Sequence, residues 1–406
     1  MPRVAITGIG AISCLGCERE RIAESLYQGR SGIVCDPKRK ELGFRSSLTG
    51  EIKDFDPDDY VTRKQRKTMT LFTIQSYAAA LQAIEHAGLE PEELQNEQNG
   101  LIFGCDSSCL TAYEQATITQ ESKSTGVLGS GYVFRSMTSN VTMNLNILLK
   151  TRGACWTISS ACSSSGHAVG QAAELIRAGK QERILCGGAQ EINWHFICSF
   201  DSLDALSVRD EKPEEASRPF SYDRDGLVPG GGAAVIILEN YDIARQRGAK
   251  ILGEICGYGF SSDGYNISVP DMDGMRRAMI MALESANIEA GNVDYVCAHA
   301  TSTPIGDGVE AMAIDSLFGE HKPPVSSLKS ICGHELWMAG AAQVVYTTIM
   351  ANKGFTAPNI NFTGPDEYSS KLKIITETLN VPPRMALCNS AGFGGTNSSL
   401  IVRYEV

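Results

Sequence analysis

The stretch that decides the fold is ACWTISSACSSSGHAVG, from Ala154 to Gly170, because its hydrophobic pattern changes partway along. Up to Ile158 the stretch is compact and rich in apolar and β-branched residues, which predicts a buried strand. Beyond Cys162 the apolar residues recur at helical spacing, and Gly179 supplies a stop for the helix. Cys162 therefore falls where a strand ends and a helix begins.

Cys162 is a candidate nucleophile because of this position. The first N–H groups of a helix and the helix dipole favour a thiolate, so we expect a lowered thiol pKa there. The small residues around Cys162 leave room for a substrate to approach closely. A buried, inert cysteine is the alternative, and position alone does not decide between the two in a chain with 13 cysteines.

Length and composition restrict the class of protein. The 406 residues are too many for one small core and suggest two fused domains or one doubled domain. With 43% hydrophobic and 20% charged residues, the chain can bury a large core and is not expected to be disordered. A net charge of −11 argues against general nucleic-acid binding.

The N-terminus and the cysteines indicate a cytoplasmic protein. Residues 1–7 lead straight into a strand-like run without the regions of a signal peptide, and no apolar run is long enough to span a membrane. An odd number of cysteines without framework spacing fits a reducing compartment. Cys14 and Cys17 form a C-x-x-C pair, but no second pair at metal-site spacing accompanies it, so we expect no metal site.

Recurring strand and glycine patterns suggest an internal duplication. The opening strand Val4–Thr7 is followed by Gly8-Ile9-Gly10, which we interpret as a tight turn, and Ile251–Gly259 repeats this pattern. Two glycine-rich loops, at Gly230–Gly232 and Gly392–Asn397, each lead into a strand. The repetition predicts two similar halves.

The predicted halves are residues 1–245 and 246–406. Strands alternate with helical patterns in both, so each should be an α/β layer around a mainly parallel sheet. Residues from about 105 to 150 are polar and lack a clear period, and we predict that they form a capping insertion in the first half.

Polar side chains fall at three strand-to-helix corners of the second half. His299 ends the strand that begins at Asp294, Lys329 ends the strand that begins at Pro324, and His334 opens a long apolar helix. In open α/β sheets, ligands bind at this edge. Either histidine alone could be structural, but one thiol, two imidazoles and one ammonium at strand ends together indicate an active site.

Four motifs, in this order, resemble those of a known family. They are S-S-A-C at Ser159–Cys162, H-x-T-S-T-P-x-G-D at His299–Asp307, K-S-x-x-G-H at Lys329–His334 and G-F-G-G-T-N at Gly392–Asn397. Essentially end to end, the chain is similar to the β-ketoacyl-acyl carrier protein synthases of bacterial fatty-acid synthesis, and most similar to the synthase I and II group. The resemblance implies a homodimer with the thiolase fold, in which duplicated βαβαβαββ halves form a five-layered αβαβα core.

The resemblance also implies a reaction and a partner. An acyl chain moves from a thioester to the cysteine, and a malonyl thioester then loses carbon dioxide to give an enolate that attacks the acyl-cysteine. Both substrates are carried on the phosphopantetheine arm of an acyl carrier protein, and no cofactor is expected. Decarboxylation generates the carbanion equivalent directly, so the chemistry needs neither a strong base nor a metal.

The family pattern implies roles for individual residues. Cys162 is the nucleophile, and His299 and His334 hold the enolate oxygen with their N–H groups. The backbone N–H groups of Cys162 and Phe393 form the oxyanion hole. Lys329 tunes the field and pairs with Glu310. The supporting residues are Glu310, Asp307, Thr301 and Thr303, and the residues that dock the acidic carrier protein are Arg63, Lys64, Arg66 and Lys67.

Three residues depart from the family pattern. Ala391 stands in place of an aromatic gate residue, Trp337 in place of a glycine, and Ala300 in place of the glycine after His299. We hypothesise that Trp337 refills part of the volume lost at Ala391 and, with Phe393, shapes the mouth of the acyl tunnel. Ser107, in the loop that lines the acyl pocket in relatives, is small and predicts room for medium or long chains.

Alternative functions remain open at this point. A thiolase would need a second cysteine as base. Cys388 lies inside a strand-like run that indicates a core position, which argues against this role. The pair Gly333-His334 argues against a synthase III-type enzyme, which would combine cysteine and histidine with an asparagine. A non-catalytic chain-length-factor subunit normally lacks the cysteine. A ketosynthase for polyenes, polyketides or another specialised lipid, working with a partner chain, stays possible, and the sequence does not fix the chain length.

Overall fold

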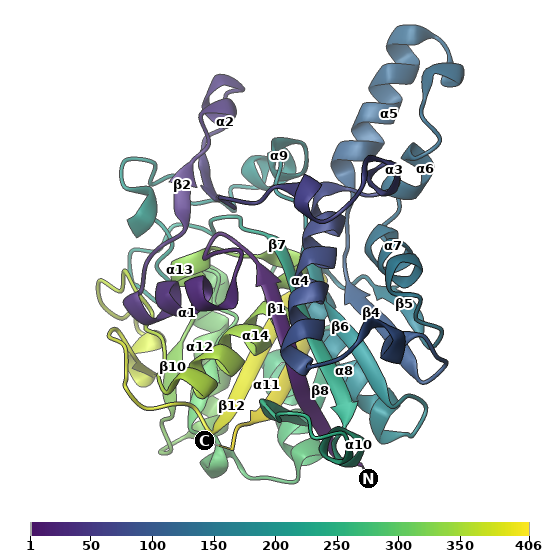
Figure 1. Cartoon of the computed structure of the whole chain (residues 1–406). Helices are drawn as coiled ribbons and strands as arrows, with labels where there is room; N and C mark the ends of the chain where they lie inside the picture. Colours follow the sequence, from purple (N-terminus) through teal and green to yellow (C-terminus); the bar gives the residue numbers. More distant parts are fainter. Residues whose placement is uncertain (1, 406) are drawn as a thin grey trace.

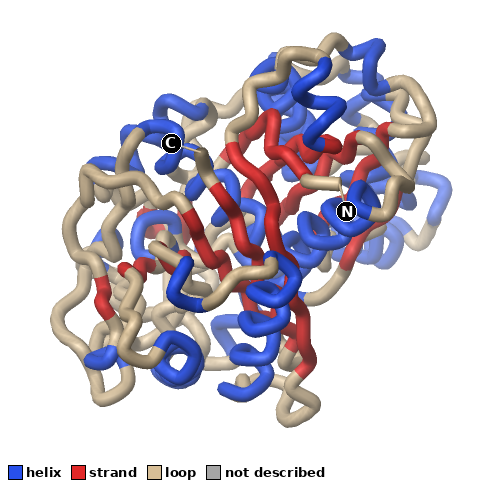
Figure 2. The backbone as a smooth tube through the Cα atoms, turned by 90° about the horizontal axis from the view of Figure 1, so that it is seen from below, coloured by secondary structure: helices blue, strands red, loops and turns tan. Residues whose placement is uncertain are grey.

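Eleven strands form one mixed sheet through the middle of the molecule (Figures 1 and 2). The computed structural model describes residues 2–405. The strand order is β11-β10-β9-β12-β13-β8-β1-β7-β6-β4-β5. The strands from the first part of the chain are β1 (Val4–Ile12), β4 (Asn99–Gly104), β5 (Cys155–Ile158), β6 (Arg183–Gln190) and β7 (Gly232–Asn240). Those from the second part are β8 (Gly253–Ser262), β9 (Tyr295–Cys297), β10 (Pro324–Ser326), β11 (Lys373–Ile374), β12 (Met385–Gly392) and β13 (Thr396–Arg403).

The two sets of strands meet at β1 and β8, which pair through Ala5–Glu254 and Ile6–Gly253. In each set, one part is parallel and one antiparallel: β5, β4 and β6 run parallel, and β6, β7 and β1 antiparallel. The second set repeats this with β10, β9 and β12, then β12, β13 and β8. The prediction of a mainly parallel sheet is therefore wrong. A tight turn suffices to join antiparallel neighbours such as β12 and β13, whereas parallel neighbours need a crossover.

Helices complete a five-layered α/β arrangement, as predicted. Helices α4 (Leu71–Ala87) and α7 (Asn140–Leu149) pack on the outer face of the first set of strands. Helices α8 (Ser164–Arg177) and α14 (Ala339–Lys353) lie in the core between the two sets. Helices α11 (Met272–Ala286) and α12 (Pro304–Phe318) cover the outer face of the second set.

Strand β1 continues through the glycines that we interpreted as a tight turn. A Cβ atom on Gly8 would lie 2.1 Å from the carbonyl oxygen of Ala83 in α4, and one on Gly10 would lie 2.1 Å from that of Ala79. Glycine is therefore required by the close approach of α4 to the strand, and not by a turn. In β8, Gly257 meets the backbone of α11 in the same way.

The predicted buried strand before Cys162 is β5, and the prediction of burial is wrong. Strand β5 is the last strand of the sheet, so only β4 pairs with it among the described residues. Cys155 is exposed, and Trp156 is 42% exposed. An apolar run cannot distinguish a strand of the core from an edge strand.

The region from about 105 to 150 contains three α-helices and a short 3-10 helix, Thr125–Val127. Figure 1 shows α5 (Cys109–Ser122) and α6 (Tyr132–Arg135) projecting from the body, and Thr111 is the only buried residue of α5. Helix α7, by contrast, packs into the outer layer beside α4. In residues 2–405 no helix is both long and apolar enough to cross a bilayer.

The remaining elements are short. They are α1 (Arg19–Gln28), α2 (Pro37–Glu41), α3 (Arg63–Arg66), α9 (Trp194–Ser202), α10 (Tyr241–Gln246), α13 (Lys329–Cys332), and the paired strands β2 (Ile33–Cys35) and β3 (Leu48–Gly50).

Candidate active site

Cys162 lies in a short 3-10 turn, Ala161–Ser163, between β5 and α8. Ala161 has a left-handed backbone (φ 46°), which is unusual for a residue with a Cβ atom and turns the chain sharply. The backbone N–H of Ala161 donates to the Asp106 carboxylate at 3.0 Å and holds this turn. Cys162 is 5% exposed and faces a pocket.

His334 is the nearest polar partner of this thiol. Its Nε2 lies 3.0 Å from the sulfur of Cys162. Its backbone N–H donates to Val228 at 2.6 Å, and its carbonyl accepts from Gly230 at 2.8 Å. Gly333, before it, has φ 71° and sits against Val228. The segment that carries Val228 and Gly230, just before β7, therefore fixes the position of His334.

His299 is the second imidazole of the site. Its ring centroid lies 5.2 Å from that of His334, with the ring planes at 87°. The Glu310 carboxylate accepts the backbone N–H groups of His299 and Ala300, at 2.8 and 2.6 Å, and the Asn389 amide at 3.1 Å. Glu310 therefore positions the end of the strand that carries His299.

Lys329 does not form the expected pair with Glu310. Its Nζ is buried and, among residues 2–405, has no hydrogen-bond partner. Glu310 is occupied by backbone and amide donors instead. Lys329 acts on the site through its charge, because its ammonium opposes the raised pKa of Cys162 and helps to lower the pKa of both histidines.

Burial dominates the titration of the site. Burial raises the pKa of the Cys162 thiol to about 12, so the expected lowering at a helix start is wrong for the resting site. Burial, with the charge of Lys329, holds the pKa of His299 and His334 well below 6.5. At neutral pH the site therefore holds a neutral thiol and two neutral imidazoles. The thiol must give up its proton as it attacks, and His334 is placed to accept it.

Asp307 ties the loop after His299 to the rest of the site. It is fully buried and accepts the backbone N–H groups of Phe220, Thr301 and Thr303, at 2.9, 2.9 and 3.2 Å. The Arg224 guanidinium lies 3.6 Å away. Burial nevertheless raises the pKa of Asp307 to about 6. Asp307 is thus a buried anchor for the loop.

A pocket of about 420 Å³ connects the surface to Cys162, His299 and His334. Its walls include Thr301 and Thr303, whose hydroxyls are 3.1 Å apart, and also Ala300 and Ala391. Phe393 lies at the pocket, is 39% exposed, and stacks on Phe200 with ring centroids 5.9 Å apart. This pocket therefore gives a ligand access from the surface to the sulfur.

Trp337 lies elsewhere than we hypothesised. It is 5% exposed and packs in a cluster with Cys162 and Phe196, whereas Ala391 packs with the outer layer of the second half and lines the pocket. The indole N–H donates to the Ser107 hydroxyl at 3.3 Å. The space left by the small Ser107 is therefore taken by Trp337, and not by an open channel.

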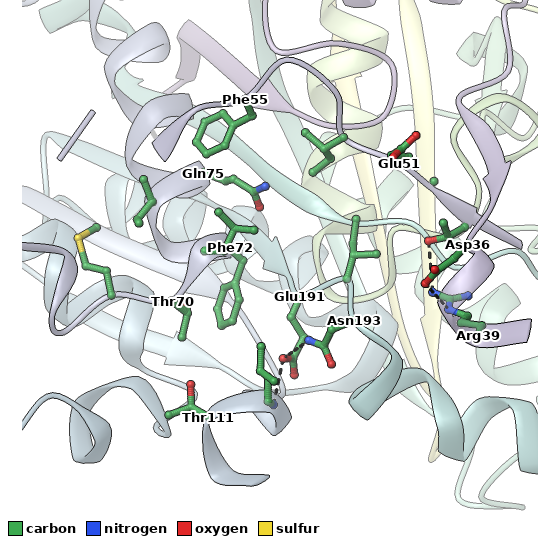
Figure 3. A pocket seen from close by; sticks show the side chains of 18 of the residues that line it. Asp36, Arg39, Glu51, Phe55, Thr70, Phe72, Gln75, Thr111, Glu191 and Asn193 are labelled. Carbon is green, nitrogen blue, oxygen red and sulfur yellow. Dashed lines mark hydrogen bonds and ion pairs between the residues drawn. The ribbon is translucent and has the colours of Figure 1, made fainter. Parts of the chain in front are cut away.

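The basic residues of α3 are on the surface. Arg63, Lys64, Arg66 and Lys67 are all exposed, and Arg66 pairs with Asp58 at 2.5 Å. They do not line the pocket of Cys162, and Arg66 contributes instead to a second pocket of about 540 Å³ (Figure 3). Figure 1 shows α3 beside α6 and the base of α5.

Two buried carboxylates near the site were not predicted. Glu335 follows His334, accepts the Tyr346 hydroxyl at 2.6 Å, and has its pKa raised to about 7 by burial. Glu191 accepts the Ser107 hydroxyl and the backbone N–H of Cys109, at 3.0 and 2.7 Å. The acidic residue directly after the histidine of the G-H motif was a signal for Glu335, but nothing in the local sequence marks Glu191.

The arrangement suits acyl transfer followed by enolate chemistry. One thiol faces an imidazole, and two neutral imidazoles converge at the end of a pocket, where their N–H groups can stabilise an oxyanion. A second cysteine, as a thiolase would need, does not line this pocket in the described part of the chain. Cys388 is buried inside β12, with Thr347 3.8 Å away.

These features define a condensing enzyme of the thiolase fold, and sequence comparison agrees. Two family profiles, described as "Beta-ketoacyl synthase, N-terminal domain" and "Beta-ketoacyl synthase, C-terminal domain", match residues 1–244 and 252–363. The chain belongs to the β-ketoacyl synthase family, whose members are acyltransferases.

The similar proteins are named more specifically. The 3-oxoacyl-[acyl-carrier-protein] synthase 1 of Haemophilus influenzae is 38% identical over 99% of both chains, and that of Escherichia coli is 37% identical over 99% of both. A solved β-ketoacyl synthase from Burkholderia phymatum superposes with a TM-score of 0.95, at 35% identity, over 100% of both chains. This confirms the predicted thiolase-like fold.

Proposed function

We propose that this protein is a 3-oxoacyl-acyl carrier protein synthase that lengthens acyl chains by two carbons in fatty-acid biosynthesis. The observation that carries the proposal is the 3.0 Å approach of His334 Nε2 to the Cys162 sulfur, with His299 beside it at the end of an open pocket. The full-length similarity to 3-oxoacyl-acyl carrier protein synthases supports the reaction and its carrier-bound substrates.

The first half-reaction is acyl transfer to Cys162. The sulfur attacks the thioester carbonyl of an acyl carrier protein, and His334 accepts the thiol proton. The backbone N–H groups of Cys162 and Phe393 stabilise the tetrahedral oxyanion. When the intermediate collapses, the carrier thiol leaves with the proton from His334, so the site returns to a neutral imidazole and holds the acyl group as a thioester.

The second half-reaction is decarboxylative condensation. A malonyl thioester enters the same pocket and loses carbon dioxide, and its electrons move onto the thioester oxygen as an enolate. The N–H groups of His299 and His334 hold this oxygen, with the proton of His334 on Nε2 in this half-reaction, and both rings are neutral because burial lowers their pKa. The enolate carbon then attacks the acyl-cysteine carbonyl. The carbon–sulfur bond breaks, and the released sulfur takes up a proton to regenerate the thiol.

Positioning residues surround these groups. Glu310 and Asp307 fix the loop that carries His299, and Thr301 and Thr303 line the path of the arm. Burial keeps the imidazoles neutral, and Lys329 adds to this effect by placing a positive charge in their surroundings. The reaction uses no cofactor.

The proposed partner is an acyl carrier protein, docked on Arg63, Lys64, Arg66 and Lys67. All four are exposed on an otherwise acidic protein, which supports contact with an acidic partner. We also infer that residues 1–245 and 246–406 are duplicated halves with a cap from about 105 to 150, and that the enzyme works in the cytoplasm.

The edge strand β5 supports a homodimer. Its free side and the exposed Trp156 would be covered if two copies paired β5 with β5 and continued the sheet. Light scattering of the purified protein tests this, and a monomer at micromolar concentration would count against the arrangement.

Mass spectrometry tests the proposed function. The protein incubated with acetyl-acyl carrier protein should gain one acetyl group on Cys162, and added malonyl-acyl carrier protein should then release a 3-oxoacyl product. The Cys162→Ala variant should gain no acyl mass. A wild-type protein that gains none either would be a non-catalytic subunit, and the proposal would fail.

A ketosynthase of a polyketide or polyene pathway is the weaker candidate. Similar solved chains include the ishigamide ketosynthase/chain length factor, at 27% identity and a TM-score of 0.93, and a type II polyketide ketosynthase complex with its acyl-carrier protein, at 30% identity. Both identities lie below the 37% and 38% of the two bacterial 3-oxoacyl synthases.

A further inference from the structure

We propose that Trp337 forms a fixed wall behind Cys162 and restricts the acyl group on this cysteine to short chains such as acetyl and butyryl. The inference rests on the proposed function, because it names the class of acyl substrate for the same site. The restriction arises because the two sides of the Cys162 sulfur differ.

On one side of the sulfur lies the open pocket, and on the other lies packed protein. The pocket of about 420 Å³ reaches Cys162 past Thr301 and Phe393, and Trp337 is not part of its wall. Behind the sulfur, the side chains are apolar and buried, as a site for a hydrocarbon chain requires, but they are in contact with one another. They are Phe196, Ile197, Leu206, Leu336 and Trp337, while Phe200 and Leu227 of the same cluster also line the open pocket.

Trp337 is the largest member of this cluster and is anchored at both ends. Its ring packs edge-to-face on Phe196, with centroids 5.7 Å apart. Its N–H donates to the hydroxyl of Ser107, which in turn donates to Glu191 at 3.0 Å. Glu191 also accepts the side-chain amide of Asn193 at 2.7 Å.

This anchorage makes a swinging gate unfavourable. Rotating the indole away would leave its N–H without a partner and would remove an aromatic contact, in a region from which water is excluded. The residue before it, Leu336, has a left-handed backbone (φ 46°) that sets the direction of the turn, and the Trp337 backbone N–H contacts Gln190 at 3.5 Å. The indole is therefore held by backbone as well as side chain.

Beyond this wall, on the other side of Ser107 and Glu191, lies a second pocket lined by both apolar and charged side chains. The space on the far side of Glu191 is the pocket of about 540 Å³, and Figure 3 shows Glu191 and Asn193 together on its wall. This pocket carries many charged side chains. They include Asp36, Arg39, Glu51, Glu114 and Arg135. Apolar side chains such as Phe55, Met69 and Phe72 line it as well, so it is the packed indole of Trp337 that keeps an acyl chain on Cys162 out of this pocket.

A long acyl chain on Cys162 would therefore have to fold back into the open pocket. The phosphopantetheine arm of the malonyl carrier needs that same pocket for the second half-reaction. Short acyl groups avoid the conflict, since they fit beside the sulfur without moving Trp337. Chain length is thus limited by the volume behind the nucleophile.

The test compares acylation of Cys162 by acetyl-, butyryl-, octanoyl- and dodecanoyl-acyl carrier protein, followed by intact mass. Wild-type protein should take acetyl and butyryl groups at least about tenfold faster than octanoyl, because the longer chain must displace a packed side chain. Trp337→Ala should raise the ratio of the octanoyl rate to the acetyl rate by about tenfold or more. Trp337→Phe, which keeps most of the bulk, should retain the short-chain preference.

Failure of this inference and failure of the proposed function give different results. The proposed role of Trp337 would be contradicted if wild-type protein accepted octanoyl as readily as acetyl. It would also be contradicted if Trp337→Ala left the ratio of the two rates unchanged. Absence of acylation by every chain length, acetyl included, would instead overturn the proposed function. The wild-type profile decides even if Trp337→Ala does not fold, and Trp337→Leu then provides a second reduction of the side-chain volume.

Discussion

The Nε2 atom of His334 lies 3.0 Å from the sulfur of Cys162, although the two residues are 172 positions apart in the sequence. Both groups are buried and neutral at rest, since burial raises the pKa of the thiol and lowers that of the imidazole. The pair therefore works by moving a proton during attack, and not by holding a preformed thiolate.

Replacement of His334 by alanine should lower the rate of Cys162 acylation by about 10²–10⁴-fold, because the thiol loses its proton acceptor. The residual rate should rise steeply with pH, since only the small thiolate fraction then reacts. Stopped-flow acylation at several pH values measures both effects. The variant His321→Ala, at an exposed histidine, should behave as wild type, and a His334→Ala rate that does not depend on pH would contradict the assigned role.

Condensation by the wild-type enzyme should not lose activity as the pH falls through 6.5. The pKa of His299 and of His334 lies well below that value, so both rings stay neutral, as His334 must be to accept the thiol proton. Values of kcat/KM measured from about pH 5.5 to 8 check this. An acidic limb with an apparent pKa close to 6.5 would show that at least one ring titrates as in water.

Replacement of Lys329 by methionine should move the acidic limb of condensation to higher pH, because the ammonium helps to lower the pKa of both histidines. The same change should raise the free energy of unfolding by about 1–3 kcal/mol, since it removes a buried charge for which the described residues supply no hydrogen-bond partner. Urea unfolding and the pH profile measure the two effects. A less stable variant with an unshifted limb would argue for a purely structural lysine.

Glu335 should make the protein less stable as the pH rises from about 4.5 to about 7. Its ordinary pKa is 4.5 and burial raises the pKa in the fold to about 7, so over this range the native state holds a proton that the unfolded state has released. This loss of stability is absent below pH 4.5 and constant above about pH 7. Asp307, with its pKa raised to about 6, adds to the same trend.

The variant Glu335→Gln should remove part of this fall in the free energy of unfolding, measured by urea titration at intervals across the range. The exposed Glu320→Gln is the matched control and should keep the wild-type slope. If the slope of Glu335→Gln equalled that of wild type, Glu335 would titrate as an exposed carboxyl does.

Charge reversal on α3, by Lys64→Glu with Lys67→Glu, should raise KM for the acyl carrier protein by about tenfold at low salt and less at high salt. The KM for a small acyl thioester without a carrier should not change, because neither lysine lines the pocket of Cys162. Reversal of the exposed Lys322 serves as the control. Equal effects on both substrates would place the damage in the active site and not in docking.

The sequence predicted the α/β architecture, with the cysteine at a strand-to-helix junction and the histidines at corners of the second half, because periodicity and glycine stops are local signals. It did not distinguish a glycine in a turn from one under a helix: Gly8 and Gly10 are needed because α4 packs on β1. It also did not reveal that β5 is an edge strand, since exposure depends on which strands arrive beside it.

By itself, then, the amino-acid sequence determined which chemical groups are available and at which kind of corner each one lies. The tertiary structure alone decided their protonation and the shape of the space around them. Burial sets the pKa of Cys162 and His334, and long-range packing places Trp337 against Ser107 and Phe196 instead of beside Ala391. The pKa values and the placement of Trp337 both depend on neighbours that are distant along the chain, so no local sequence pattern could predict them.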